Sequence, residues 1–178
     1  MTQKLIAGAA IVLLGATGLS SAAGAGQRPP ASAAGHVHAA APAPATAPAP
    51  MKAHSGPLPA LPRVSFEPPR PMAIVQQVYE FAARHPEVLQ YVPCYCGCER
   101  AGHNGNHDCF VKNRAADGRV TEFDAHGFGC AICIDVARDA MTLSRSGASP
   151  ADIRAAIDKK YGARFASATP TPQPPVRR

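Results

Sequence analysis

Hydrophobic residues recur at helical spacing in three stretches of the chain. In the first, residues 72–84, the apolar side chains share one helical face. This stretch stops at His85-Pro86, because a proline disfavours a helical residue before it. Pro86 suits the first turn of a short second helix over residues 87–91. The apolar face of the first helix consists of Ile74, Val75, Val78, Phe81 and Ala82.

The longest predicted helix covers about residues 130–144, between the glycines at its start and Gly147, which suits its C-terminal cap. Apolar residues occupy most of its circumference, which is typical of a central helix packed by its neighbours. Ser149 then caps a last helix over residues 150–162, with Pro150 at its first position.

Residues 93–129, between the second helix and the long one, have little apolar periodicity and are rich in glycine and asparagine. This composition predicts irregular backbone, with a turn at 115–119 and a short extended piece at 120–123. The expected fold is mainly α: a small domain of three or four helices around a cysteine-rich irregular segment. A disordered N-terminal tether and a disordered C-terminal tail are expected to flank it.

Four segments follow from composition. Residues 1–25 have the layout of a secretory signal peptide, with Lys4, an apolar run and an A-x-A pattern. Residues 26–62 are mostly Ala, Pro, Gly and Ser, and predict a disordered tether that includes His36, His38 and His54. The cysteine-rich helical domain is expected over 63–166, and a disordered tail over 167–178.

The apolar run of the signal is short for a bilayer span of about 20 residues, which favours cleavage over an uncleaved anchor. We therefore expect an extracytoplasmic protein, periplasmic or secreted, with no stable membrane span after cleavage. An uncleaved signal would leave it membrane-anchored. No cysteine precedes Cys94, so lipidation of an N-terminal cysteine is not expected.

The formal net charge of +6 does not indicate a nucleic-acid surface. All 12 acidic residues and 13 of the 18 Lys and Arg lie within 63–166, so the expected domain is nearly neutral. No basic stripe with interleaved aromatic residues occurs, and nucleic acid is not an expected partner.

All six cysteines lie between positions 94 and 133. Outside the cytoplasm thiols tend to oxidise, so a disulfide framework is the main alternative to a metal site. Cys130 and Cys133 form a C-x-x-C at the predicted start of the long helix, where the free amides and the helix dipole stabilise thiolates. That placement serves soft-metal binding or thiol–disulfide exchange, although the βαβ context of a thioredoxin-like motif is missing.

Cys94, Cys96 and Cys98 form a C-x-C-x-C run whose alternate side chains point to one side of an extended segment. The spacing is tighter than that of a zinc knuckle and poor for disulfides between near neighbours. Several thiolates at close quarters favour a soft ion, and Cu(I) is the leading one outside the cytoplasm. Zinc and an iron–sulfur cluster are the less favoured candidates, since no familiar cluster spacing occurs.

Three histidines lie in the same stretch and are candidate nitrogen ligands beside the thiolates. They are His103 and His107 in the glycine-rich loop, and His126 four residues before Cys130. With Cys109, the candidate metal ligands are thus all six cysteines and these three histidines. Cys94, directly after Pro93, is the one expected to be structural.

The motif of residues 93–98, Pro-Cys-Tyr-Cys-Gly-Cys, resembles that of the PCYCGC-motif proteins. Gly102-His103, Asp108-Cys109-Phe110-Val111, His126-Gly127 and Gly129-Cys130-x-x-Cys133 agree with it in order. The likeness covers about residues 70–162. It implies an exported bacterial protein, and the family is named for its motif and not for a settled activity.

The sequence predicts an exported soft-metal binding protein, which handles or delivers copper through a Cys/His cluster. Its expected partners are the metal ion and an extracytoplasmic cuproenzyme or transporter. Two alternatives stay open: a disulfide-stapled binding or structural module, and a thiol–disulfide oxidoreductase using Cys130 and Cys133. No hydrolytic triad or phosphate loop is present in the sequence, and no catalytic residue is assigned.

Overall fold

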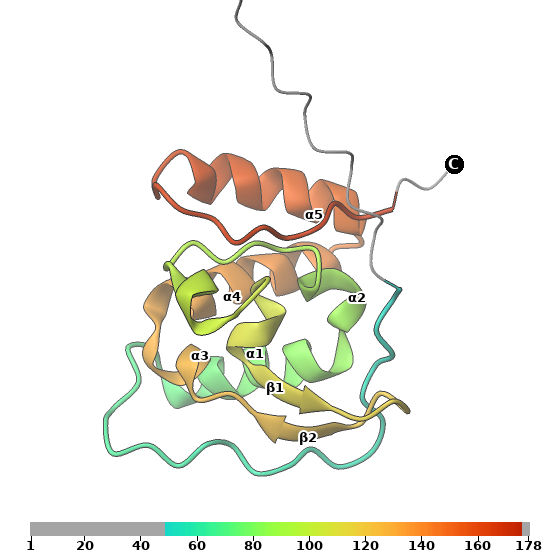
Figure 1. The fold of residues 1–178 in the computed structure, drawn as a ribbon, viewed down its shortest axis with the longest axis vertical. Coiled ribbons are helices and arrows are strands. Elements are labelled where there is room, and N and C mark those ends of the chain that lie inside the picture. Colours follow the sequence, from blue (N-terminus) through green and yellow to red (C-terminus); the bar gives the residue numbers. More distant parts are fainter. Residues whose placement is uncertain (1–48, 176–178) are drawn as a thin grey trace, which may run out of the picture. The chain divides into compact units, whose positions relative to one another are not determined.

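The computed structural model of the protein describes residues 49–175, which belong to one compact unit (Figure 1). Five α-helices and two strands follow one another along this part of the chain, with short 3-10 turns at Cys98–Ala101 and His107–Cys109. A π-helical turn, Asp158–Gly162, extends the last helix. The elements are α1 (Met72–Arg84), α2 (Pro86–Leu89), β1 (Val111–Arg114), β2 (Val120–Phe123), α3 (His126–Gly129), α4 (Ala131–Arg145) and α5 (Pro150–Ile157).

Helix α4 is the centre of the fold, as its apolar circumference predicted. It packs against α1, α2, α3 and α5. Its buried residues include Ile134, Val136 and Ala137, and they meet the buried face of α1, which includes Val75 and Val78. The bounds of α1 are those predicted from its pattern.

Helix α5 begins at the cap predicted for it. Ser149 Oγ accepts the backbone N–H of Asp152 at 3.2 Å, and Pro150 occupies the first helical position.

Strands β1 and β2 form an antiparallel hairpin in which Val111 pairs with Phe123 and Arg114 pairs with Val120. The sequence predicted the second strand as a short extended piece, but not the sheet. The fold is therefore mainly α, as expected, with five helices where three or four were predicted. The difference arises because α3 is a single turn of four residues, too short for a hydrophobic period to reveal it.

The expectation of a disordered tether is wrong for its last part, residues 49–62. His54 is 4% exposed. Its backbone N–H donates to the carbonyl of Ala83 at 3.0 Å, and its ring Nδ1 accepts the backbone N–H of Val120 at 2.8 Å. The segment thus joins the end of α1 to the hairpin. A low-complexity composition concealed this role, because it depends on one histidine meeting two backbone groups far along the chain.

The expectation of a disordered tail is likewise wrong for residues 167–175. Thr169 and Thr171 are buried, and Arg154 Nη1 donates to the carbonyls of Thr171 and Pro172 at 3.3 and 3.1 Å. This segment runs beside α5 in Figure 1, where it is drawn in red. The compact unit therefore extends beyond the predicted limits of 63–166 at both ends.

The expected signal peptide, residues 1–25, and residues 26–48 of the expected tether lie outside the described residues. Among the helices within 49–175, none has both the length and the apolarity that a membrane crossing requires.

Candidate metal centre

The six cysteine sulfurs meet in one place, which we call the sulfur cluster (Cys94, Cys96, Cys98, Cys109, Cys130 and Cys133). All six, which lie within the described residues, are free thiols. Cys94 Sγ lies 3.3 Å from Cys96 Sγ and 3.4 Å from Cys133 Sγ. These separations are far longer than a disulfide bond of about 2.05 Å. The predicted convergence of the early cysteines with the C-x-x-C is found, and the disulfide framework has no support.

The C-x-C-x-C run turns sharply at Gly97, whose φ of 81° lies in the left-handed region that a side chain would oppose. The turn lets the three sulfurs of Cys94, Cys96 and Cys98 come within 4.8 Å of one another. The chain then enters the 3-10 turn at Cys98. A glycine in the middle of the motif is thus needed for the sulfurs to face the same point.

Helix α4 supplies the C-x-x-C. Cys130 is its N-cap residue, in an extended conformation, and Cys133 lies in its first turn. With Cys96 and His126 they make the first donor group, in which the four ligand atoms all lie within 4.8 Å of one another. Only Cys133 of these four is fully buried, so the first donor group reaches the surface of the domain.

A second donor group consists of Cys98, His103, Cys109 and His126, whose ligand atoms also lie within 4.8 Å of one another. The sulfurs of Cys98 and Cys109 are 3.7 Å apart, and both residues are buried. The His103 and His126 rings meet edge to face with centroids 5.1 Å apart. His126 therefore stands within reach of both groups.

Cys94 lies inside the sulfur cluster, and the expectation that it is structural or left over stays a prediction. Cys94 is 0% exposed, and it forms compact triples with Cys109 and Cys133 and with Cys96 and Cys98. Its backbone is fixed from both sides by Thr169, whose N–H donates to the Cys94 carbonyl at 2.9 Å. In return, Cys94 N–H donates to Thr169 Oγ1 at 2.8 Å.

Two of the three candidate histidines, His103 and His126, belong to the donor groups, and His107 does not. His126 Nε2 lies 3.3 Å from Cys96 Sγ, and His103 belongs to the second donor group. His107 belongs to neither group. It is buried, with Nδ1 3.3 Å from Asp108 Oδ1 and Nε2 3.2 Å from Arg114 Nη2. Its expected role as a ligand is replaced by one that links the loop to β1.

Asp124 is a site residue that the sequence analysis missed. Its Oδ1 accepts the N–H of His126 at 2.7 Å, and its Oδ2 lies 3.9 Å from His103 Nε2. Its own carbonyl accepts the Tyr79 hydroxyl at 2.6 Å, which ties it to α1. The sequence did contain a signal for this contact, because an Asp side chain commonly accepts the backbone N–H two residues further along the chain.

Asn106 is a second residue that the sequence analysis missed. It is 0% exposed, and its Nδ2 donates to the carbonyl of Cys133 at 3.2 Å. Its backbone N–H donates to the carbonyl of Val92 at 2.8 Å. Asn106 thus connects the loop before Cys109 to the first turn of α4.

Gly127 allows α3 to approach Cys109 and Phe110. A Cβ at this position would lie 2.6 Å from the carbonyl oxygen of Cys109 and 2.6 Å from the Phe110 ring. No other residue type fits without displacing this backbone. His126 immediately precedes this glycine in the sequence.

The thiols of the cluster have strongly different proton affinities. Contacts with Cys109, Cys133 and Cys96 lower the pKa of Cys94, and contacts with Cys130 and Cys133 lower that of Cys96 to about 5. The pKa of Cys133 is raised by its contacts with Cys109, Cys130 and Cys94. Contacts with Cys130 and Cys96 raise the pKa of His126 to about 10. Without a metal, these contacts favour the thiolate forms of Cys94 and Cys96 and the protonated form of His126.

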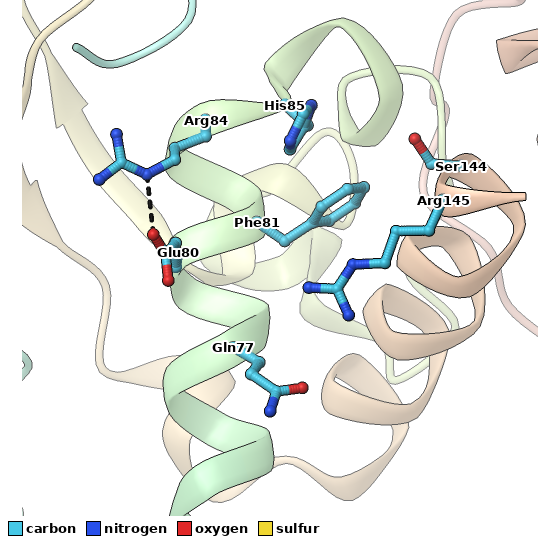
Figure 2. Close-up of a pocket in the computed structure, with 7 residues that line it drawn as sticks. All are labelled: Gln77, Glu80, Phe81, Arg84, His85, Ser144 and Arg145. Carbon is cyan, nitrogen blue, oxygen red and sulfur yellow. Dashed lines mark hydrogen bonds and ion pairs between the residues drawn. The ribbon is translucent and has the colours of Figure 1, made fainter. Parts of the chain in front are cut away.

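A pocket of about 340 Å³ lies away from the sulfur cluster, between the C-terminal ends of α1 and α4. Figure 2 shows its lining side chains projecting from these helices, among them Phe81, Arg145 and the Arg84–Glu80 ion pair of 2.9 Å. No cysteine lines it.

The arrangement fits a soft metal ion. A tetrahedral ion with bonds of about 2.3 Å to sulfur separates its sulfurs by about 3.8 Å. Four sulfur–sulfur contacts in the cluster, 3.3 to 3.7 Å long, lie within half an ångström of that value. In addition, His103 Nδ1 is buried and has no hydrogen-bond partner within the described residues. Thiolate and imidazole donors at these distances can hold a metal ion.

Fold and site together define a small, cysteine-rich, mainly helical domain with a Cys/His donor cluster. The chain belongs to the family described as proteins of unknown function with a PCYCGC motif, whose model matches residues 63–174. No curated protein and no solved structure matches it.

Proposed function

We propose that the protein binds Cu(I) outside the cytoplasm and carries it as cargo. The observation that supports this proposal most strongly is the first donor group, in which Cys96, Cys130, Cys133 and His126 present their ligand atoms within 4.8 Å of one another. Three sulfurs and one imidazole form a donor set that a soft monovalent or borderline divalent ion prefers.

Copper is favoured over zinc by the surplus of sulfur around this group. A structural zinc site is closed by four ligands. Here a fifth donor contacts the group, because Cys94 Sγ lies 3.4 Å from Cys133 Sγ. Extra thiolates at contact distance suit Cu(I), whose affinity for soft ligands is high. An iron–sulfur cluster is less well supported, because the cysteine spacing matches no familiar cluster motif.

A role in transfer is favoured over permanent storage by the half-exposed ligands. Cys96, His126 and Cys130 are neither buried nor fully exposed, so a partner's ligands can reach the ion as it leaves. The partner would be an extracytoplasmic cuproenzyme or transporter, and the expected signal peptide would direct the protein to the periplasm or the exterior.

The test is a competition titration of the reduced protein with a chromophoric Cu(I) chelator under anaerobic conditions. Cu(I) should be withdrawn from the chelator, and Cys96→Ser and His126→Gln should each weaken binding. His85→Gln is the matched control, because His85 is exposed at the end of α1 and contacts Glu87 instead of a sulfur. It should bind as the unaltered protein does.

Failure to compete for Cu(I), with tight binding of Zn²⁺ instead, would replace copper by zinc in this account. Failure to bind either ion in the fully reduced protein would end the metal proposal. Circular dichroism of each variant should accompany the titration, so that a folding defect is not read as a lost ligand.

One feature favours thiol–disulfide exchange as a second candidate. Cys130 is half-exposed at the N-cap of α4, while Cys133 is buried one turn further on, as an attacking and a resolving thiol would be. Cys133→Ser should then trap a mixed disulfide between Cys130 and a partner protein. Without exchange chemistry, the same variant weakens metal binding only.

A further inference from the structure

The sulfur cluster contains more donors than one ion can use. A tetrahedral ion takes four ligands, and the first donor group already provides them. Cys98, Cys109 and His103 are then left over, together with Cys94. These residues lie close together. Cys98 Sγ and Cys109 Sγ are 3.7 Å apart, and a ring nitrogen of His103 lies within 4.8 Å of both.

Burial makes leaving those donors unused unfavourable. Cys94 and Cys109 are 0% exposed and Cys98 is 3% exposed. Buried polar or ionised groups without partners cost free energy unless a hydrogen bond, an opposite charge or a metal compensates. His103 Nδ1 is such a group, because it is buried and has no hydrogen-bond partner in the described part of the chain.

Cys94 occupies the position between the two donor groups. It contacts Cys96 and Cys133 of the first group at 3.3 and 3.4 Å, and it lies within 4.8 Å of Cys98 and of Cys109 in the second. A thiolate has several lone pairs and can bind two soft ions at once. No other cysteine outside the two donor groups exists in the sequence.

We propose that the domain holds two soft metal ions, one in each donor group, with Cys94 as the bridging thiolate. This inference rests on the proposed function and adds the second site and the bridge to it. The first ion is bound at the half-exposed edge by Cys96, Cys130 and Cys133. The second lies deeper, on Cys98, Cys109 and His103. Cys94 brings each set to four donors, and His126 lies within reach of both.

Native mass spectrometry of the reduced full chain, loaded anaerobically with Cu(I), tests the inference by counting ions. Two ions per chain are expected. Cys130→Ser should retain only the inner ion, and Cys98→Ser should retain only the outer one. Because Cys98 is buried and its variant can misfold, His103→Gln provides a second route to losing the inner ion. The control His85→Gln should hold two ions.

X-ray absorption at the copper edge then tests the bridge. Two ions that share Cys94 should show a copper neighbour in the outer shell, and Cys94→Ser should abolish that signal. Two bound ions without a copper neighbour would overturn the bridge.

The other outcomes separate the two proposals. A single ion in the unaltered protein overturns the second site while copper binding stands. No bound ion removes both proposals, and three or more ions replace the two-ion centre by a larger cluster. Loss of both ions in a folded His103→Gln variant would also contradict two separable sites.

Discussion

Cys94 Sγ lies 3.4 Å from Cys133 Sγ, although 39 positions separate the two residues in the chain. One belongs to the irregular segment after α2 and the other to the first turn of the central helix. Their contact shows that the fold brings the two cysteine motifs to one point. The ligand atoms of the other four cysteines and of His126 lie within 4.8 Å of one or both of these sulfurs.

The carboxylate of Asp124 should matter for metal affinity although it is not proposed as a ligand. Asp124→Ala removes the acceptor that holds the backbone N–H of His126 at 2.7 Å, so the turn that carries this imidazole loses an anchor. Residues that orient a metal ligand typically contribute about 10- to 100-fold in affinity. We expect a loss of that size in the Cu(I) competition titration.

Asp117→Ala is the matched control for this variant, because Asp117 lies on the exposed turn between β1 and β2 and contacts Arg119. It should leave the affinity unchanged. An equal affinity in the Asp124 variant would show that His126 is not a ligand or needs no support.

The metal-free protein should keep His126 protonated well above neutral pH. Contacts with Cys130 and then Cys96 raise its pKa to about 10. A pKa that is raised in the folded state stabilises that state. The whole contribution is present below the ordinary pKa of about 6.5, and it is lost as the pH rises through the pKa of the folded state. An NMR titration of the His126 ring protons should therefore show a midpoint near 10.

Cys130→Ser should move this midpoint down towards the ordinary value, since the largest contribution to the shift is removed. A midpoint that is already near about 6.5 in the unaltered protein would mean that no thiolate faces the ring.

Thr169→Val should destabilise the domain through the backbone of Cys94. The substitution leaves the buried Cys94 N–H without the hydroxyl that accepts it at 2.8 Å. An unsatisfied buried donor costs about 1–3 kcal/mol. Urea unfolding of the reduced, metal-free protein should show a loss of this size. The exposed Thr142→Val should change the free energy of unfolding by no more than about 0.5 kcal/mol. An equal stability of the two variants would indicate that residues 167–175 do not stabilise the centre.

Gly127→Ala should be costly for a different reason. The added Cβ would overlap the Cys109 carbonyl and the Phe110 ring, each 2.6 Å away. Overpacking of this kind costs about 1–3 kcal/mol, and the shift of α3 should also weaken metal binding. Gly162→Ala is the control, because a Cβ there meets no atom within 4 Å. Thermal unfolding that gives the same midpoint for both variants would contradict the close approach described for Gly127.

The helices were the part of the fold that the sequence could predict. The apolar face of 72–84 gave the bounds of α1, and Ser149-Pro150 identified the start of α5, because both signals are local. The hairpin was harder, because its strands have four residues each and its side chains Lys112 and Glu122 pair on an exposed face.

For the site, the spacing of the cysteines predicted that they would converge, since a C-x-C-x-C run and a helix-start C-x-x-C both present sulfurs to one side. Spacing could not rank Cys94, whose central position depends on Cys133 approaching from the far end of the segment. Nor could it separate His103 from His107, because the half-buried Arg114 that engages His107 lies on a strand whose pairing was not predicted. Long-range hydrogen bonds of His54 and Thr169 were hidden for the same reason.

The most direct test of the central claim is elemental analysis and thiol counting on one sample, purified without exposure to air. The account predicts bound copper in the sample, and six titratable thiols once the metal has been removed and the chain denatured. Three disulfides, no titratable thiol and no bound metal would contradict it, and the sulfurs would then serve to staple the fold.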